Sequence, residues 1–348
     1  MGPKKSVTQL SAILLVVMVL IFGTCIGTNP GAYAAEEIRL KFAFPFPKND
    51  MYIGPEYMIQ ELEKRTNGRV KITPYFNQSL GNMMDSLEML QSGIADIVLF
   101  PPTAFSKVFQ IFEAPSLPSL NVPNLAMSHE IVYTLLERGL LKKDLAGLKP
   151  LIFEGIDPMY LYFTKKVTSL DELRKMKLRA GPGVSTAVVE ALGCSVVNIP
   201  SPDVYMAIDR GVADGLAIMP DAYFSSRLNE VAKHHLDLPF GTGAIITVMT
   251  QKTWDSLPAD IQIIWEKINW EAKYYYLEEV TRRHPNRYEE YKNAGAETYS
   301  LSPEESKKWL KLTETITDTW VKDKKAQGYP AEEALDLIRL TVESFQKK

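Results

Sequence analysis

Cysteine is nearly absent from this chain, which has two in 348 residues. So few cysteines exclude a disulfide framework, and the fold must rest on a conventional apolar core. Cys25 falls in an N-terminal leader-like segment, which leaves Cys194 alone in the rest of the chain. Cys194 stands among Leu192, Val196 and Val197. We therefore expect a buried structural thiol there, in preference to a nucleophile.

Motifs of metal and nucleotide chemistry are also missing. The four histidines are not spaced as metal ligands, and there is no P-loop, G-x-S-x-G motif or dinucleotide fingerprint. We predict no catalytic residue, no metal site and no cofactor. The formal net charge of −3 argues against nucleic acid as a partner.

Long apolar runs are confined to the N-terminus. The run Ala12 to Phe22 follows Lys4 and Lys5 and is shorter than the ~20 residues that a spanning helix needs. Ala32-Tyr33-Ala34 then supplies an A-x-A cleavage signal. We predict an exported protein with a signal peptide over residues 1–34, cleaved after Ala34. A lipoprotein beginning at Cys25 and a retained membrane anchor are the alternatives.

The richest pattern lies between Lys177 and Met219, where strand and helix signals alternate. Lys177 to Ala180 and Ser195 to Ile199 are typical of short strands, and Leu216 to Met219 of a third. Val184 to Leu192 has the apolar spacing of a helix, and Ser201-Pro202-Asp203 is a strong helix start. The stretch predicts a β-α-β-α-β unit with a parallel sheet and right-handed crossovers.

Arg179 ends the first of these strands. In α/β sheets ligands bind outside the carboxyl ends of the strands, and a helix N-terminus is expected just after Gly181-Pro182-Gly183. A guanidinium beside free backbone N–H groups is a good receptor for a carboxylate. A structural ion pair with a nearby acid is the alternative for Arg179.

The first half of the chain follows the same plan. Strands are predicted over residues 38–44, 70–75 and 96–100, with helices over 55–66 and 83–91 between them. The segments 151–164 and 238–250 carry the chain into a second α/β lobe and back, which predicts a hinge. A helical pattern then runs from Ala259 to about Asn293 and is expected to kink at Pro285.

A family resemblance joins these observations. The residues LRAGPG…ALG…VNIPSPDVYMAIDRGVADG, within Leu178 to Gly215, resemble the signature of the solute-binding subunits of tripartite ATP-independent periplasmic (TRAP) transporters of the dicarboxylate-binding DctP type. Gly68 to Ile97 and Thr253 to Gln262 are similar to further segments of that family. The resemblance extends over nearly all of the chain after the leader.

The resemblance implies an α/β, two-lobed periplasmic-binding-protein-like fold with a hinge and a long lobe-bridging helix. We expect residues 35–156 and 241–283 to form lobe I, and residues 157–240 and 284–348 to form lobe II. In the family, an arginine in the position of Arg179 grips the carboxylate of the substrate.

Other ligand contacts of the family come from loops at the edges of the lobes. Several polar family positions are occupied here by apolar or aromatic residues, although core packing is the alternative for each aromatic taken alone. We expect the ligand-binding residues to be Arg179, Tyr160, Tyr162, Phe44, Phe100, Met219, Ile218 and Ser201. Such a pocket, with one charged anchor and apolar walls, predicts an apolar or aromatic monocarboxylate as the ligand.

The function implied is that of a periplasmic receptor, expected as a monomer, that delivers a carboxylate to a TRAP membrane permease. A receptor for a signalling partner is an alternative. An enzyme acting on a small carboxylate is another, but Ser185 has no adjacent histidine and no carboxylate pair stands out.

Overall fold

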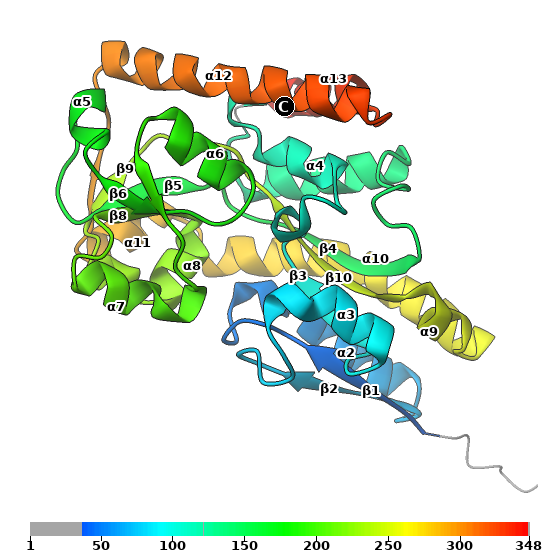
Figure 1. The fold of residues 1–348 in the computed structure, drawn as a ribbon. Helices are drawn as coiled ribbons and strands as arrows, with labels where there is room; N and C mark the ends of the chain where they lie inside the picture. Colours follow the sequence, from blue (N-terminus) through cyan, green and yellow to red (C-terminus); the bar gives the residue numbers. More distant parts are fainter. Residues whose placement is uncertain (1–36, 121, 347–348) are drawn as a thin grey trace, which may run out of the picture. The chain divides into compact units, whose positions relative to one another are not determined.

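Two β-sheets organise the chain (Figure 1). The computed structural model describes residues 37–120 and 122–346, and the predicted leader lies outside these residues. Among them, five strands form the first sheet in the order β2–β1–β3–β10–β4, and six form the second in the order β11–β9–β5–β8–β6–β7. From Arg39 onward, both sheets belong to one compact unit.

The first sheet collects strands from both ends of a long stretch of sequence. Its strands are β1 (Ile38–Ala43), β2 (Val70–Tyr75), β3 (Ile97–Phe100), β4 (Leu148–Gly155) and β10 (Ala244–Thr250). Strands β1 and β3 are parallel, whereas β10 is antiparallel to both β3 and β4. Strand β3 is a short apolar run buried along its whole length, as expected for a strand covered on both faces. The predicted strands over 38–44, 70–75 and 96–100 are confirmed to within one residue at each end.

Helical segments connect the strands of the first sheet. They are η1 (Asp50–Tyr52), α2 (Ile53–Arg65), η2 (Met83–Asp85), α3 (Ser86–Ser92), η3 (Pro102–Phe105), η4 (Ile111–Ser116), η5 (Pro118–Leu120) and α4 (Leu125–Glu137). Helix α4 begins at an effective cap, because the side chain of Asn124 accepts a hydrogen bond from the backbone N–H of Met127. This helix packs against β4.

The second sheet contains the predicted β-α-β-α-β unit. Its strands are β5 (Tyr160–Phe163), β6 (Lys177–Arg179), β7 (Ser195–Val197), β8 (Gly215–Ile218), β9 (His234–Leu236) and β11 (Glu297–Tyr299). Its helical segments are α5 (Leu170–Leu173), α6 (Val184–Ala191), η6 (Ser201–Asp203), α7 (Val204–Asp209), α8 (Pro220–Ser225) and η7 (Leu228–Glu230). Strand β6 is parallel to both β7 and β8, which confirms the parallel arrangement. The sequence pattern did not predict β9 and β11, which have three residues each.

The chain passes between the sheets through two paired segments. The N–H of Ile156 donates to the carbonyl of Gly243 at 3.2 Å, and the N–H of Met159 donates to that of Gly241 at 3.1 Å. The hydroxyl of Thr242, which is fully buried, donates to the carbonyl of Ile156 at 2.6 Å. Hydrogen bonds therefore hold together the outgoing and the returning segment.

The predicted long helix is present and ends earlier than expected. After α9 (Gln251–Asp255), helix α10 runs without a break over Ala259–Arg283. His284 leaves the helical region at φ −124° and ψ 64°, because the ring of Pro285 disfavours a helical residue before it. The side chain of Asn286 then caps a separate helix, α11 (Arg287–Asn293). Proline thus ends the helix here, where a kink was predicted.

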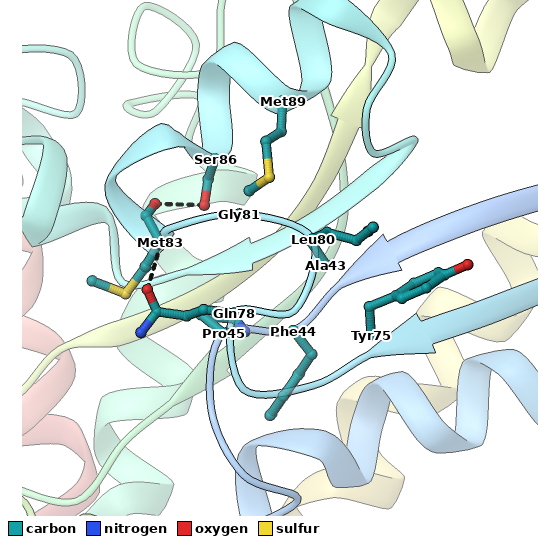
Figure 2. Close-up of a pocket in the computed structure, with 10 residues that line it drawn as sticks. All are labelled: Ala43, Phe44, Pro45, Tyr75, Gln78, Leu80, Gly81, Met83, Ser86 and Met89. Atoms are coloured by element: carbon teal, nitrogen blue, oxygen red, sulfur yellow. Dashed lines mark hydrogen bonds between the residues drawn. The ribbon is translucent and has the colours of Figure 1, made fainter. Parts of the chain in front are cut away.

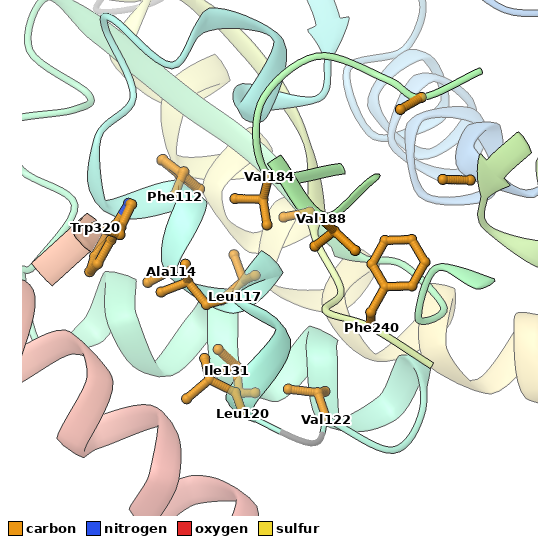
Figure 3. Packing of buried hydrophobic residues seen from close by; sticks show 14 of the residues in the cluster. Phe112, Ala114, Leu117, Leu120, Val122, Ile131, Val184, Val188, Phe240 and Trp320 are labelled. Atoms are coloured by element: carbon orange, nitrogen blue, oxygen red, sulfur yellow. The ribbon is translucent and has the colours of Figure 1, made fainter. Parts of the chain in front are cut away.

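The last two helices lie over the rest of the fold. Helix α12 (Pro303–Ala326) contacts α5, α6 and η5, and α13 (Ala331–Gln346) packs against α4 and η4. A large apolar cluster draws on both sheets: Figure 3 shows Val184 and Val188 of α6 near Phe112, Leu117 and Phe240. A smaller cluster around Tyr162 and Tyr223 covers another part of the second sheet.

Cys194 is buried in the large apolar cluster, as the sequence predicts. Burial raises the pKa of its thiol to about 12. Among the helices of the described residues, none has the length and apolar character needed to cross a membrane.

Candidate functional site

The guanidinium of Arg179 is held at the carboxyl end of β6 by two oxygen atoms. Its Nε donates to the carbonyl of Ile199 at 3.2 Å, and its Nη2 donates to the Oγ of Ser201 at 3.2 Å. Both partners follow β7, the strand next to β6 in the sheet. The parallel pairing of β6 and β7 therefore brings Arg179 and Ser201 together, although 22 positions separate them in the sequence.

Arg179 is partly buried, and no carboxylate of the described residues forms an ion pair with it. Burial lowers the pKa of the guanidinium below its ordinary value, because desolvation penalises the charged form. The group still carries its charge, since arginine is not deprotonated in proteins. Both neighbouring oxygens are neutral, so the positive charge is hydrogen-bonded without being neutralised.

The turn after Arg179 leads directly into α6. Gly183 precedes the helix with a φ of 80°, a left-handed conformation that glycine adopts readily. A Cβ atom at Gly183 would lie 3.0 Å from the backbone oxygen of Thr103, in η3. The turn is therefore in close contact with the segment that follows β3 in the first sheet.

Three further candidate residues lie at the same edge of the second sheet. Tyr160 and Ile218 are opposite each other in the antiparallel pair β5–β8, and Met219 follows β8 directly. Strand β8 also pairs with β6, so these residues are at most two strands away from Arg179. The ring of Tyr160 packs edge-on against His235, with centroids 4.8 Å apart.

A small cavity of about 10 Å³ adjoins Met219 and is acidic. It is lined by Asp50, Met51, Leu125, Ile156, Asp157, Met219, Asp221 and Tyr276. The pKa of Tyr276 is raised well above its ordinary value, mainly by burial and further by Glu154 and by the aspartates Asp157, Asp221 and Asp50. These aspartates were not predicted from the sequence, although Asp157 and Asp221 each stand within three residues of a strand end.

Phe44 lies beside another small cavity, shown in Figure 2. The ring of Phe44 is fully buried and packs against Tyr52, Phe46 and Phe76 at centroid distances between 5.2 and 6.0 Å. The cavity has a volume of about 10 Å³, which is close to the space that one water needs. Polar lining comes from Gln78, whose Oε1 accepts a hydrogen bond from the N–H of Met83.

Phe100 and Tyr162 belong to packed aromatic clusters. Phe100 is fully buried between Phe105 and Phe109, with centroids 4.8 and 5.4 Å away. Tyr162 is also fully buried and stacks on Tyr223 at 3.9 Å. Its hydroxyl forms a hydrogen bond of 2.7 Å with that of Tyr291. The structure thus brings Arg179 and Ser201 into direct contact. By contrast, Phe44, Phe100 and Tyr162 are each packed among other aromatic side chains.

No group of three or more histidine, cysteine, aspartate or glutamate side chains among the described residues is arranged to hold a metal ion. The histidines are engaged in packing and hydrogen bonds. Burial lowers the pKa of His129 and that of His235 to about 4, so both are neutral near pH 7.

The relatives of this chain are solute-binding proteins of bacteria. Residues 46–323 match the DctP family, described as bacterial extracellular solute-binding protein, family 7. The C4-dicarboxylate-binding periplasmic protein DctP of Rhodobacter capsulatus is 27% identical over 289 residues, which cover 82% of this chain and 86% of that protein.

Two solved structures show the same fold. A TRAP solute-binding protein from a marine metagenome, specific for aromatic acid ligands and solved with 3-hydroxybenzoate, has a TM-score of 0.77 at 22% identity, covering 89% of this chain and 99% of its own. DctP7 of Bordetella pertussis, an extracytoplasmic solute receptor binding pyroglutamic acid, has a TM-score of 0.78 at 18% identity, covering 86% and 99%. The predicted family and fold class are confirmed. This chain belongs to the DctP family of bacterial extracellular solute-binding proteins, the periplasmic binding components of TRAP transporters.

Proposed function

We propose that this protein captures an organic carboxylate on Arg179 and delivers it to a TRAP-type membrane permease. The observation that carries the proposal is the state of Arg179: a partly buried guanidinium, hydrogen-bonded to neutral oxygens and without an ion-pair partner among the described residues. A buried charge is costly unless it is paired, so an anion from outside stabilises this arrangement. A carboxylate matches the planar geometry of the group.

The existing hydrogen bonds favour one orientation of the ligand. Nε and one N–H of Nη2 donate to Ile199 and Ser201, whereas both N–H groups of Nη1 and one of Nη2 have no partner among the described residues and could bind a ligand. In this proposal the carboxylate makes two parallel hydrogen bonds with Nη1 and Nη2. Ser201 then acts as a positioning residue that fixes the plane of the guanidinium.

The proposed ligand is an apolar or aromatic monocarboxylate. Tyr160, Ile218 and Met219 supply apolar surface at the edge of the sheet that holds Arg179. The cavity beside Met219 is lined by Asp50, Asp157 and Asp221, and Asp50 is already paired with Arg283 and His284. None of the residues that line this cavity is a cation, so it offers no partner to a second carboxylate. The aromatic acid bound by the metagenomic relative is consistent with this class. The apolar wall of the pocket is still predicted to include Phe44, Phe100 and Tyr162. Each of these residues would contact the ligand only if one face of its ring is accessible from the pocket.

The proposed route follows from the family. The chain is exported, loses its leader after Ala34 and acts in the periplasm, with residues 35–156 and 241–283 as one lobe and 157–240 and 284–348 as the other. The paired segments at Ile156–Gly243 and Met159–Gly241 support a hinge between them. One helix departs from this division: α13 packs on α4, so we assign α13 to the first lobe and not to the second. A ligand that contacts both lobes only when they close would favour the closed state.

Calorimetry on the mature protein tests the ligand class. We expect benzoate or 3-hydroxybenzoate to bind, and benzamide to bind at least about a hundredfold more weakly, because the neutral amide cannot pair with the guanidinium. Succinate is the matched dicarboxylate. If succinate binds more tightly than every aryl or branched-chain monocarboxylate, the proposed ligand class is wrong; if benzamide equals benzoate, the proposed anchor is wrong.

A further inference from the structure

One face of helix α10 exposes large apolar side chains. Ile263, Trp270 and Tyr274 are 71%, 56% and 53% exposed. They stand at positions i, i+7 and i+11, which places them on one stripe of the helix. The opposite face of α10 is buried, with Trp265, Ile268, Ala272 and Tyr276 among its inward residues, and the helix packs against α2 and β4. Within the chain, Trp270 and Tyr274 also lie near the ammonium of the buried Lys273, 5.5 and 5.6 Å from their ring centroids. More than half of each of the three outer side chains nevertheless remains exposed.

Two aromatic rings of the stripe contact each other. The rings of Trp270 and Tyr274 meet edge to face with centroids 5.4 Å apart. Beside them, Tyr275 is 41% exposed and stacks on Tyr57 of α2 at 4.4 Å. Exposed tryptophan and tyrosine gathered in one patch are typical of protein interfaces, where they supply most of the binding energy.

Two charges of opposite sign flank the aromatic centre on the same stripe. Lys267 lies one turn before Trp270, and Glu278 lies one turn after Tyr274; both are exposed. Neither forms an ion pair with another of the described residues, although the charge of Lys267 also helps to lower the pKa of Glu271, one turn further along the helix. Their neighbours are engaged within the chain, Glu266 with Lys149 at 2.7 Å and Glu279 with Arg282 at 2.6 Å. The stripe therefore reads lysine, tryptophan, tyrosine, glutamate along the helix axis.

This order is complementary to itself when one copy is turned around. We propose that the stripe is the contact surface of a homodimer in which α10 of one chain packs antiparallel against α10 of a second copy. A two-fold axis near residue 272 places Trp270 against Tyr274 of the second copy and Lys267 close to Glu278 of the second copy, each contact occurring twice. A parallel arrangement would instead set Lys267 against Lys267. A stripe that binds an anionic lipid surface should carry basic residues on both sides of its aromatic centre. Here one of the two flanking residues is the acidic Glu278, which argues against a membrane as the partner.

The dimer is independent of ligand capture. Helix α10 packs against α2 and against β4, a strand of the first sheet. The guanidinium of Arg179, in contrast, is held by residues that follow β7 of the second sheet. The dimer replaces the monomer expected from the sequence and leaves the anchor as it is. Its test therefore does not depend on the identity of the ligand.

Sedimentation equilibrium of the mature protein, over a range of concentrations, tests the proposal. We expect a reversible dimer for the wild type. Trp270→Ala should weaken the dimer at least about tenfold, and so should Lys267→Glu or Glu278→Lys, since each reversal sets like charges together. The double variant Lys267→Glu with Glu278→Lys should recover at least part of the lost affinity, because the pair is restored with its signs exchanged.

Leu340→Glu is the matched control. Leu340 is 62% exposed on α13, away from the stripe, so this variant should dimerise as the wild type does. All substituted side chains are exposed, and the melting temperature should confirm that each variant folds. A wild type that remains monomeric up to millimolar concentration overturns the proposal. A dimer that tolerates Trp270→Ala overturns it as well, and a double variant no better than the singles overturns the antiparallel arrangement.

Discussion

The strand ends of the two sheets differ in what they present. In the first sheet β3 ends in Phe100, whose ring is fully buried among other rings. In the second sheet β6 ends in Arg179, which is partly buried and hydrogen-bonded to neutral oxygens. The topological rule that ligands bind at strand ends applies to both positions. The contrast teaches that the rule locates an edge, whereas packing decides which side chains on that edge are available to a ligand.

The largest effect is expected at the buried ring. Phe100→Ala should lower the free energy of unfolding by about 3–5 kcal/mol, because it removes a packed aromatic side chain and leaves a cavity. Urea denaturation measures the change. Val108→Ala, at a nearby side chain that is 45% exposed, should change stability by less than about 0.5 kcal/mol. Equal effects of the two substitutions would show that Phe100 is not part of a packed core.

Substitution of Arg179, at the charged end of β6, should reduce ligand affinity and leave the fold intact. Arg179→Ala should cost about 2–5 kcal/mol in the affinity for benzoate or 3-hydroxybenzoate, which is roughly 30-fold to several thousand-fold. Arg179→Lys should also bind weakly, because an ammonium group cannot make the paired hydrogen bonds.

Arg174→Ala is the control for that measurement, since Arg174 is an exposed arginine paired with Asp171 at 3.5 Å. It should bind as the wild type does. Calorimetry gives the affinities and thermal melting without ligand confirms the fold. Binding by Arg179→Ala within a factor of three of the wild type would reduce Arg179 to a structural role.

The two regions also share one feature, a buried neutral histidine. His129 accepts a hydrogen bond from the N–H of Gly155 through Nδ1 at 3.2 Å. The Nδ1 of His235 lies 3.2 Å from the hydroxyl oxygen of Thr298, with which it shares a hydrogen bond. Burial lowers the pKa of each histidine to about 4, below the unfolded value of about 6.5. The unfolded chain therefore binds the proton more tightly, and stability is lost as the pH falls from about 6.5 towards 4.

For each of these histidines, lowering the pH from 7 to 5 should therefore reduce the free energy of unfolding by roughly 2 kcal/mol. Glu154 acts in the opposite direction, because burial raises its pKa well above the ordinary value. The measurement is therefore the difference between the wild type and His129→Asn, in which an amide oxygen can take the place of Nδ1. The variant should lose about 2 kcal/mol less over this range. Parallel stability curves for the two proteins would contradict the prediction.

The smallest effect concerns the orientation of the guanidinium. Ser201→Ala removes the hydroxyl that accepts from Nη2 and should weaken benzoate binding by about 1 kcal/mol, or about fivefold. Ser201→Thr should restore it. The preference for benzoate over benzamide should narrow in Ser201→Ala, because the hydroxyl acts through the charged group; an unchanged preference would mean that Ser201 does not position Arg179.

Much of this architecture could be predicted from local pattern. The unit from β6 to β8 has clear strand runs, a turn at Gly181-Pro182-Gly183 and a helix start at Ser201-Pro202-Asp203, and the structure contains each element. Strands β9 and β11 could not be predicted, because three residues carry no periodicity and each strand depends on pairing with a distant neighbour. The end of α10 differs from the prediction, because Pro285 excludes the preceding residue from the helix and so ends it, whereas a kink was expected.

The candidate site was predictable only in part. Arg179 is found by a rule about strand ends, and its contact with Ser201 follows from the pairing of β6 with β7. The carbonyl of Ile199 has no signature in sequence, because every residue has a carbonyl. The stacking of Tyr162 on Tyr223 depends on residues 61 positions apart, which only the fold brings together.

The single thiol of the described chain has a practical consequence. Cys194 is buried in the main apolar cluster, and a pKa of about 12 keeps it almost entirely protonated at neutral pH. Maleimide dyes react with exposed thiolates, so the native cysteine should stay silent during labelling. In a mature protein cleaved after Ala34, which has also lost Cys25, a cysteine introduced at an exposed position such as Val212 would then carry the only fluorophore. The wild-type background is in this way already suited to optical sensors and single-molecule distance measurements, with no need to remove a native residue first.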